Sequence, residues 1–184
     1  MDKGAEWYVQ YLDGDEQAFV EIVRAYKDGL ILYINGFVHN LSIAEELTED
    51  VFVKLGVKKP KNKGGSHFKT WLYTIARHTA IDYLRKATKT RAVSLDACAD
   101  MADEKGLEKT YFRRERDVTV HRAMNRLKEE YRQALWLVYF EDFSYQQVAK
   151  AMGKSVHSIE TLVYRARRSL RAELEKEGFV YENL

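Results

Sequence analysis

Residues 144–168 read SYQQVAKAMGKSVHSIETLVYRARR, a pattern typical of two short helices that meet at a sharp turn. Ser144 with Gln147 forms a capping box at the start of the first helix. Gly153 stands where the chain must turn, because glycine adopts the left-handed conformation at no steric cost. Ser155 can cap the second helix. The stretch therefore predicts a helical hairpin with a tight corner.

The spacing across this corner favours a DNA-binding motif. Ala149 is small where two crossing helices would touch, Gly153 follows four residues later, and Ile159 six residues after that, which is the layout of a helix-turn-helix. The second helix would then lie in the major groove, where Arg reads guanine and Glu can accept from cytosine. Phosphate contacts are expected from Lys154, Arg167 and Arg171. The outward residues are His157, Ser158, Glu160, Thr161, Tyr164, Arg165 and Arg168. The alternative is an ordinary hairpin with a basic exposed face.

Composition indicates a folded, all-α protein of two small helical domains. The 184 residues are 46% hydrophobic, with ten Gly and one Pro, too few turn residues for a β-sandwich or barrel. The one Cys, Cys98, excludes an internal disulfide and a multi-cysteine zinc site, and it predicts a reduced, cytoplasmic protein. We expect no signal peptide and no membrane insertion, because no uncharged run is apolar enough to cross a bilayer.

Apolar periodicity predicts helices, separated by two breaks. A capping box at Ser42 and Glu45 is expected to begin the second helix, and Ser66 to cap the third. The segment 57–65, VKKPKNKGG, is a basic loop. The division predicted is a first domain over 1–87, a linker over 88–117, and a second domain over 118–184. The expected helices cover 15–40, 43–56, 66–87 and 118–140, with two short helices around Gly153 in 144–176.

Charge along the chain is uneven. Residues 1–50 hold 3 basic and 11 acidic side chains, whereas residues 51–95 hold 11 basic and 1 acidic. The basic block suits a polyanion. The acidic block suits a positively charged protein surface, or shields the basic block, unless both are simply solvated faces.

The helix expected over 66–87 combines aromatic and cationic residues on one face. Rings interleaved with cations suit single-stranded nucleic acid, since base stacking contributes about 1–3 kcal/mol per base. The alternative is that Trp71 and Tyr73 belong to the core or its rim. The residues of this face are Lys69, Trp71, Tyr73, Thr74, Arg77, His78, Asp82 and Arg85.

The preceding stretch, AEELTEDVFVKL over 44–55, divides into an inner apolar and an outer acidic face. The outer carboxylates could dock on a basic protein surface, or could be solvated charge near a helix N-terminus, where it is favourable. They are Glu45, Glu46, Glu49 and Asp50.

Together these stretches resemble the bacterial sigma factors, most closely the two-domain extracytoplasmic-function class. The resemblance rests on AEELTEDVFVKL, FKTWLYTIARHTAIDYLRK and YFEDFSYQQVAKAMGKSVHSIETLVYRARRSLR, in this order. It implies a transcription initiation factor that binds core RNA polymerase, at the clamp helices of its largest subunit and at its flap. It also implies duplex promoter DNA at the −35 element, single-stranded DNA with a flipped base at the −10 element, and an anti-sigma factor. The acidic linker residues Asp96, Asp100, Asp103 and Glu104 would mimic nucleic acid inside the polymerase.

The resemblance also implies a role for particular residues. The polymerase-binding residues would be Glu46, Glu49, Asp50 and Lys54. The −10 element would contact Lys58, Lys59, Lys61, Asn62, Lys63, Lys69, Trp71, Tyr73, Thr74, Arg77, His78 and Arg85. The −35 element would contact Ser144, Tyr145, Lys154, Ser155, His157, Ser158, Glu160, Thr161, Tyr164, Arg165 and Arg168.

The sequence departs from the family pattern in three respects. Asn62 stands where many members have an aromatic residue in the flipped-base pocket. Glu160 and Leu162 stand in the recognition helix where members usually or often have basic residues. Lys128 replaces a proline after Leu127. The base preferences therefore cannot be copied from relatives.

Two other function classes compete with this interpretation. A free-standing helix-turn-helix regulator would bind duplex DNA without polymerase, usually as a dimer, and it would leave the 66–87 face without a role. An enzyme is not expected, because no metal-ligand or nucleophile–base spacing stands out. No cofactor and no metal are expected either.

Overall fold

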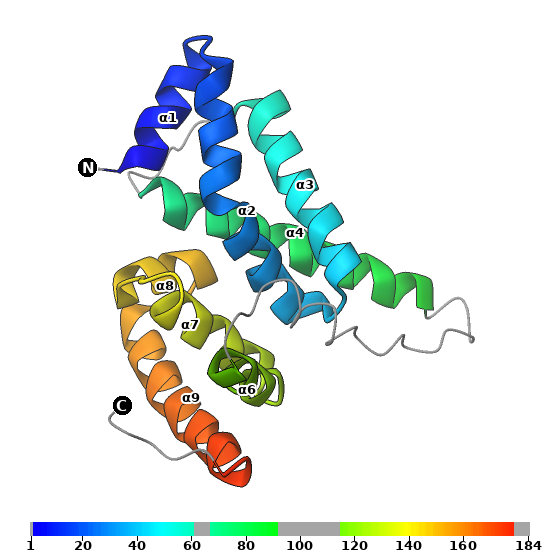
Figure 1. Ribbon diagram of the computed structural model, residues 1–184, viewed down its shortest axis with the longest axis vertical. Coiled ribbons are helices and arrows are strands. Elements are labelled where there is room, and N and C mark those ends of the chain that lie inside the picture. Colours follow the sequence, from blue (N-terminus) through cyan, green and yellow to red (C-terminus); the bar gives the residue numbers. More distant parts are fainter. Residues whose placement is uncertain (1, 61–66, 92–114, 179–184) are drawn as a thin grey trace. The chain divides into compact units, whose positions relative to one another are not determined.

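The computed structural model describes residues 2–60, 67–91 and 115–178, and every regular element in these ranges is an α-helix (Figure 1). The helices form two compact units, α1–α4 and α6–α9. This confirms the all-α class. Most of the linker predicted over 88–117 lies outside the described residues, as do Ser66, Lys61, Asn62 and Lys63.

The first unit contains α1 (Lys3–Leu12), α2 (Glu16–Val38), α3 (Leu41–Lys58) and α4 (Phe68–Arg91). Helix α2 packs against the other three, and α4 crosses α2 and α3 (Figure 1). Ile22, Ile34, Val51, Leu55 and Leu72 are fully buried between them. Burying one such side chain stabilises the fold by about 1.5–3 kcal/mol.

Two helix starts in the first unit differ from the prediction. The capping box at Ser42 and Glu45 was wrong, because Asn40 caps α3 by accepting a hydrogen bond from the Ile43 N–H. Helix α1 was not predicted. It begins at Asp2, whose carboxylate accepts from the Ala5 N–H at 3.2 Å.

The second unit contains α6 (Glu115–Asn125), α7 (Glu129–Tyr139), α8 (Tyr145–Met152) and α9 (Val156–Lys176). Helix α9 packs against the other three. The core of this second unit includes Leu135, Val148, Ile159 and Val163. The prediction of one helix over 118–140 was wrong, because α6 and α7 are separated by a turn.

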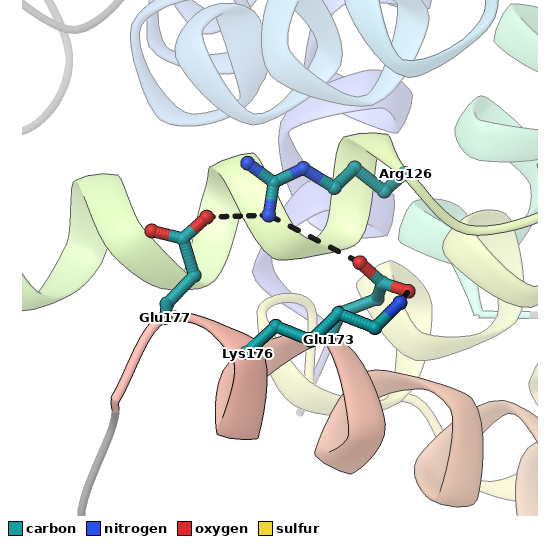
Figure 2. Close-up of polar contacts among 4 residues, drawn as sticks. All are labelled: Arg126, Glu173, Lys176 and Glu177. Carbon is teal, nitrogen blue, oxygen red and sulfur yellow. Dashed lines mark hydrogen bonds and ion pairs between the residues drawn. The ribbon is translucent and has the colours of Figure 1, made fainter.

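An ion-pair cluster fastens the end of α9 to the turn after α6. The Arg126 guanidinium donates a hydrogen bond to the Glu177 carboxylate and lies 4.0 Å from the Glu173 carboxylate (Figure 2). The Lys176 ammonium also pairs with Glu173, at 2.6 Å. These side chains are partly exposed, so the cluster contributes modestly to stability. It holds the last turns of α9 against the rest of the unit.

Candidate nucleic-acid and protein interfaces

The turn between α8 and α9 has the geometry predicted for a helix-turn-helix. Ser144 Oγ accepts from the Gln147 N–H, and the Gln147 side chain accepts from the Ser144 N–H at 2.8 Å. Gly153 has φ 65°, in the left-handed region. Ser155 Oγ accepts from the Ser158 N–H at 3.2 Å. Both caps and the glycine corner are therefore confirmed, and they fix where α9 begins.

Helix α9 separates an apolar inner face from a polar outer face. Ile159, Val163 and Ala166 are buried, so the residues between them point outward. Because these residues are exposed, they could contact the edges of the bases, which an α-helix can reach in the major groove. The exposed set contains His157, Ser158, Glu160, Thr161, Tyr164, Arg165 and Arg168.

Some predicted −35 residues have partners within the protein. Lys154 Nζ lies 3.0 Å from a Glu130 carboxylate oxygen. His157 Nδ1 lies 3.7 Å from a carboxylate oxygen of Glu160. A phosphate contact by Lys154 would therefore compete with an ion pair that joins α7 to the helix-turn-helix. Tyr145, the first residue of α8, is half-buried.

Helix α4 carries an exposed stripe at the expected i, i+3, i+4 spacing. Trp71 and Thr74 are half-buried at its start, and His78 and Arg85 are exposed farther along. The Arg85 guanidinium pairs with Asp82 at 2.6 Å. Lys69 and Arg77 are half-buried, and Lys69 lies on the side of the buried Tyr73, with its Nζ 6.0 Å from the centre of that ring.

Tyr73 does not lie on that exposed stripe. It is 1% exposed, and its ring centroid lies 5.2 Å from that of Tyr33 on α2. Placing Tyr73 on the DNA-contacting face was therefore wrong, and the alternative that it belongs to the core is confirmed. Helix α4 packs against both α2 and α3, which widens its buried face. Trp71 packs at its edge against Phe68 and Tyr8, with centroids 5.7 and 5.4 Å away.

Helix α3 presents the acidic face that the sequence predicts. Glu46, Glu49 and Asp50 are exposed. The structure adds Val53 and Val57, which are 58% and 78% exposed and continue the same stripe toward the end of the helix. Sequence reasoning missed both, although their spacing of three and seven residues from Asp50 places them on the outer face.

Lys54 was predicted beside this acidic face and has an internal partner instead. Its ammonium donates to Thr79 Oγ1 on α4 at 2.9 Å, and the side chain is half-buried. Its position links α3 to α4. At the end of α3, Lys58 and Lys59 are exposed, and Lys59 adopts the left-handed conformation that ends the helix.

Two other kinds of site are not found among the residues that the structure describes. Across 2–60, 67–91 and 115–178, no group of three or more His, Cys, Asp or Glu side chains could hold a metal ion. In the same ranges, no helix is sufficiently long and apolar to cross a membrane.

Comparison with known proteins identifies the family of both units. Residues 22–90 match the family described as Sigma-70 region 2, and residues 117–170 match Sigma-70, region 4. The chain is 31% identical over 172 residues to the RNA polymerase sigma-H factor of Pseudomonas aeruginosa, covering 88% of this chain and 89% of that one. It is 28% identical over 178 residues to the ECF RNA polymerase sigma factor SigW of Bacillus subtilis, covering 90% and 93%.

Solved structures show the same fold. The sigma factor RpoE from Bartonella quintana, solved in complex with the anti-sigma factor NepR, matches with a TM-score of 0.68 and 24% identity, covering 85% of this chain and 96% of that one. CnrH, solved in complex with the cytosolic domain of CnrY, matches with a TM-score of 0.70 and 20% identity, covering 95% and 99%. This chain therefore belongs to the sigma-70 family of RNA polymerase sigma factors, in the extracytoplasmic-function class, and is a transcription initiation factor.

Proposed function

We propose that the two units divide promoter recognition between them, the first reading the −10 element and docking on core polymerase, the second reading the −35 element. One observation carries this proposal: α3 exposes carboxylates and valines, whereas α4 exposes cations beside the half-buried Trp71 and α9 exposes arginines and Tyr164. A surface of the first kind suits a protein partner, and surfaces of the second kind suit DNA.

The outer face of α3 is the polymerase-docking surface. Glu46, Glu49 and Asp50 supply carboxylates for a basic partner, which steer association through complementary charge. Val53 and Val57 supply apolar surface, which binding would remove from water. An acidic stripe that becomes apolar fits the side of a helical partner such as the polymerase clamp helices.

The exposed stripe of α4 contacts the −10 element. Trp71 can stack on a base, while Arg77 and Arg85 neutralise phosphates of the single strand. Extruding a base costs a few kcal/mol of lost stacking, which contacts to the flipped base offset. Lys58 and Lys59 add cations beside this stripe, and Tyr73 is left out because it is buried.

The outer face of α9 reads the −35 element as duplex. Its capped N-terminus points positive backbone N–H groups toward the phosphates. Arg165 and Arg168 can make bidentate contacts with guanine, and Glu160 can accept from cytosine. The glutamate at 160 would reject a phosphate there, so it sets base preference rather than affinity.

Regulation and location follow from the same assignment. The solved relatives in complex with an anti-sigma factor and with the CnrY cytosolic domain support an anti-sigma partner for this chain, one that covers the α3 and α9 faces. Because the docking partner is core polymerase, the chain acts in the cytoplasm, and it contributes binding energy rather than a catalytic group of its own.

A charge reversal on α3 tests the docking assignment. In the full chain, we expect Asp50→Lys to weaken binding to core polymerase at least about tenfold, because like charges replace an attractive pair. Glu16→Lys is the matched control, since it makes the same change on exposed surface of α2. Both affinities would be measured by fluorescence anisotropy of labelled protein. Equal affinities for the two variants would contradict the docking assignment, and binding of duplex DNA without polymerase would favour the free-standing regulator.

A further inference from the structure

Helix α1 joins the end of α3 to the beginning of α4. It precedes the stretch over 22–90 that matches Sigma-70 region 2. Its N-cap, Asp2, accepts from the Ala5 N–H of α1 through Oδ1 and from the Phe68 N–H of α4 through Oδ2. One carboxylate therefore caps two helices. His67 Nδ1 lies 3.6 Å from the same Oδ2.

The other end of α1 holds the last residues of α3. The buried Tyr8 donates its hydroxyl to the Pro60 carbonyl at 2.9 Å, and Tyr11 donates to the Gly56 carbonyl at 2.9 Å. The Gly56 carbonyl is in the last turn of α3, where carbonyls have no partner within the helix. Lys59 Nζ lies 4.7 Å from the centre of the Tyr11 ring. Burial, and secondly Tyr11, raise the pKa of Tyr8 to about 12, so its hydroxyl keeps the proton that it donates.

Close packing fixes the direction of α1 between these two anchors. A Cβ added to Gly4 would stand 2.5 Å from the Phe68 ring and from the Tyr26 hydroxyl, so only glycine permits this approach. The Tyr8 ring lies 5.5 Å from that of Phe68 and 5.4 Å from that of Trp71. The same tyrosine therefore contacts the exposed stripe of α4 through its ring and the end of α3 through its hydroxyl.

We propose that α1 is a positioning element of the −10 interface: it sets Lys58, Lys59 and Pro60 at the end of α3 against the Trp71 end of the α4 stripe. The inference rests on the function proposed above. A binding surface needs its groups held to within about 0.5 Å, and residues behind the contacting ones supply that rigidity. Without the tyrosine hydroxyls, the cations of α3 and the ring of Trp71 would no longer be fixed relative to each other. DNA binding would then have to order these groups, and the lost conformational entropy would lower both the affinity and the discrimination between −10 sequences.

The test removes two hydroxyls and keeps both rings. Tyr8→Phe and Tyr11→Phe are combined in the full chain, with Tyr139→Phe in the other unit as the matched control. Each protein is combined with core polymerase on a promoter found by transcription of genomic fragments. The readout is the ratio of transcript from that promoter to transcript from versions with one −10 base changed. The same ratio for −35 changes, the polymerase affinity and the helix content by circular dichroism are measured in parallel.

We expect −10 discrimination to fall about tenfold in the double variant, since two hydrogen bonds of ordinary strength account for such a factor. The −35 discrimination and polymerase affinity should stay within about twofold, and Tyr139→Phe should match the wild type. Unchanged −10 discrimination in a folded double variant would overturn the inference. An equal fall in both discriminations or in polymerase affinity would also overturn it, because α1 would then serve stability alone. Wild-type protein without any −10 discrimination would instead contradict the proposed function itself.

Discussion

A buried arginine bonds across the break between α6 and α7. Arg132 Nη1 donates to the Asn125 carbonyl at 3.0 Å, at the end of α6 where carbonyls lack partners within the helix. Burial lowers the pKa of Arg132, and Glu129 opposes that shift. The spacing of apolar residues gives no sign of a hydrogen bond between a side chain and a backbone carbonyl seven residues earlier. This is why the sequence predicted a continuous helix over 118–140.

Removing this guanidinium should loosen the end of α6. We expect Arg132→Met to lower the opening free energy of α6 by about 1–3 kcal/mol, because the partly buried Asn125 carbonyl loses its donor. Arg165→Met, the same change on the exposed face of α9, should stay within about 0.5 kcal/mol of the wild type. Amide hydrogen exchange followed by NMR measures both. If α6 exchanged equally in the two variants, Arg132 would have no role at this turn.

Glu160 is the residue at which base preference is most open to change. It is exposed near the start of α9, with His157 3.7 Å away. We expect Glu160→Lys to change the −35 sequence selected from randomised promoters and to leave the −10 sequence as it was, because Lys favours guanine where Glu favours cytosine. Glu175→Lys, also exposed on α9, is the control. Identical −35 sequences for wild type and Glu160→Lys would exclude 160 from base reading.

At the scale of the helix, the sequence predicted the caps and the turn of the helix-turn-helix correctly, because each depends on residues that are close in sequence. Ser144, Gly153 and Ser155 each act within four residues of their own position, and all three behave as expected. The start of α3 is also capped locally, because the Asn40 side chain accepts from the Ile43 N–H, so that signal was in the sequence and was missed. The place of α1 against α3 and α4 depends on tertiary packing. Asp2 and the ring of Tyr8 acquire their roles only once α4 is in place, although Asp2 before a helical spacing of Ala5, Tyr8 and Leu12 was a usable signal.

The candidate interfaces were predictable to different degrees for the same reason. An isolated amphipathic pattern predicts which half of a helix is exposed, and this sufficed for the outer face of α9 and for the carboxylates of α3. Helix α4 packs against α1, α2 and α3, so Tyr73 is buried where a single-faced pattern leaves it outside. Lys54 likewise donates a hydrogen bond to Thr79, which is 25 residues away in sequence. The periodicity of apolar residues does not predict contacts between residues so far apart in sequence.

The stripe on α3 makes a further prediction at the scale of the element. Val53→Asn should weaken polymerase binding about threefold to tenfold by removing apolar area from the interface. Stability should change little, because Val53 is already in water. Val9→Asn, on an equally exposed position of α1, controls for a general effect of surface polarity, and titration with core polymerase compares the two. Equal affinities would confine the docking surface to the carboxylates.

The whole molecule joins two compact units of limited size, each of which we propose presents one helix to DNA. Phosphate contacts make such binding strongly salt-dependent, with a log–log slope of about −0.9 for each duplex phosphate neutralised. Neither unit alone would select one site in a genome, where specificity ratios must exceed the number of competing sites. Linking two elements through one polymerase raises selectivity by effective concentration. The fold thus explains why both units occur in one chain.

Transcription in vitro tests this account most directly. The purified full chain would be added to bacterial core polymerase, with fragmented genomic DNA as template, and the transcripts mapped to their start sites. We predict discrete transcripts that appear only with the chain, and start sites preceded by two shared elements at −35 and −10. Absence of any such transcript with an active, matched core polymerase, together with tight binding to duplex DNA without it, would contradict the central claim.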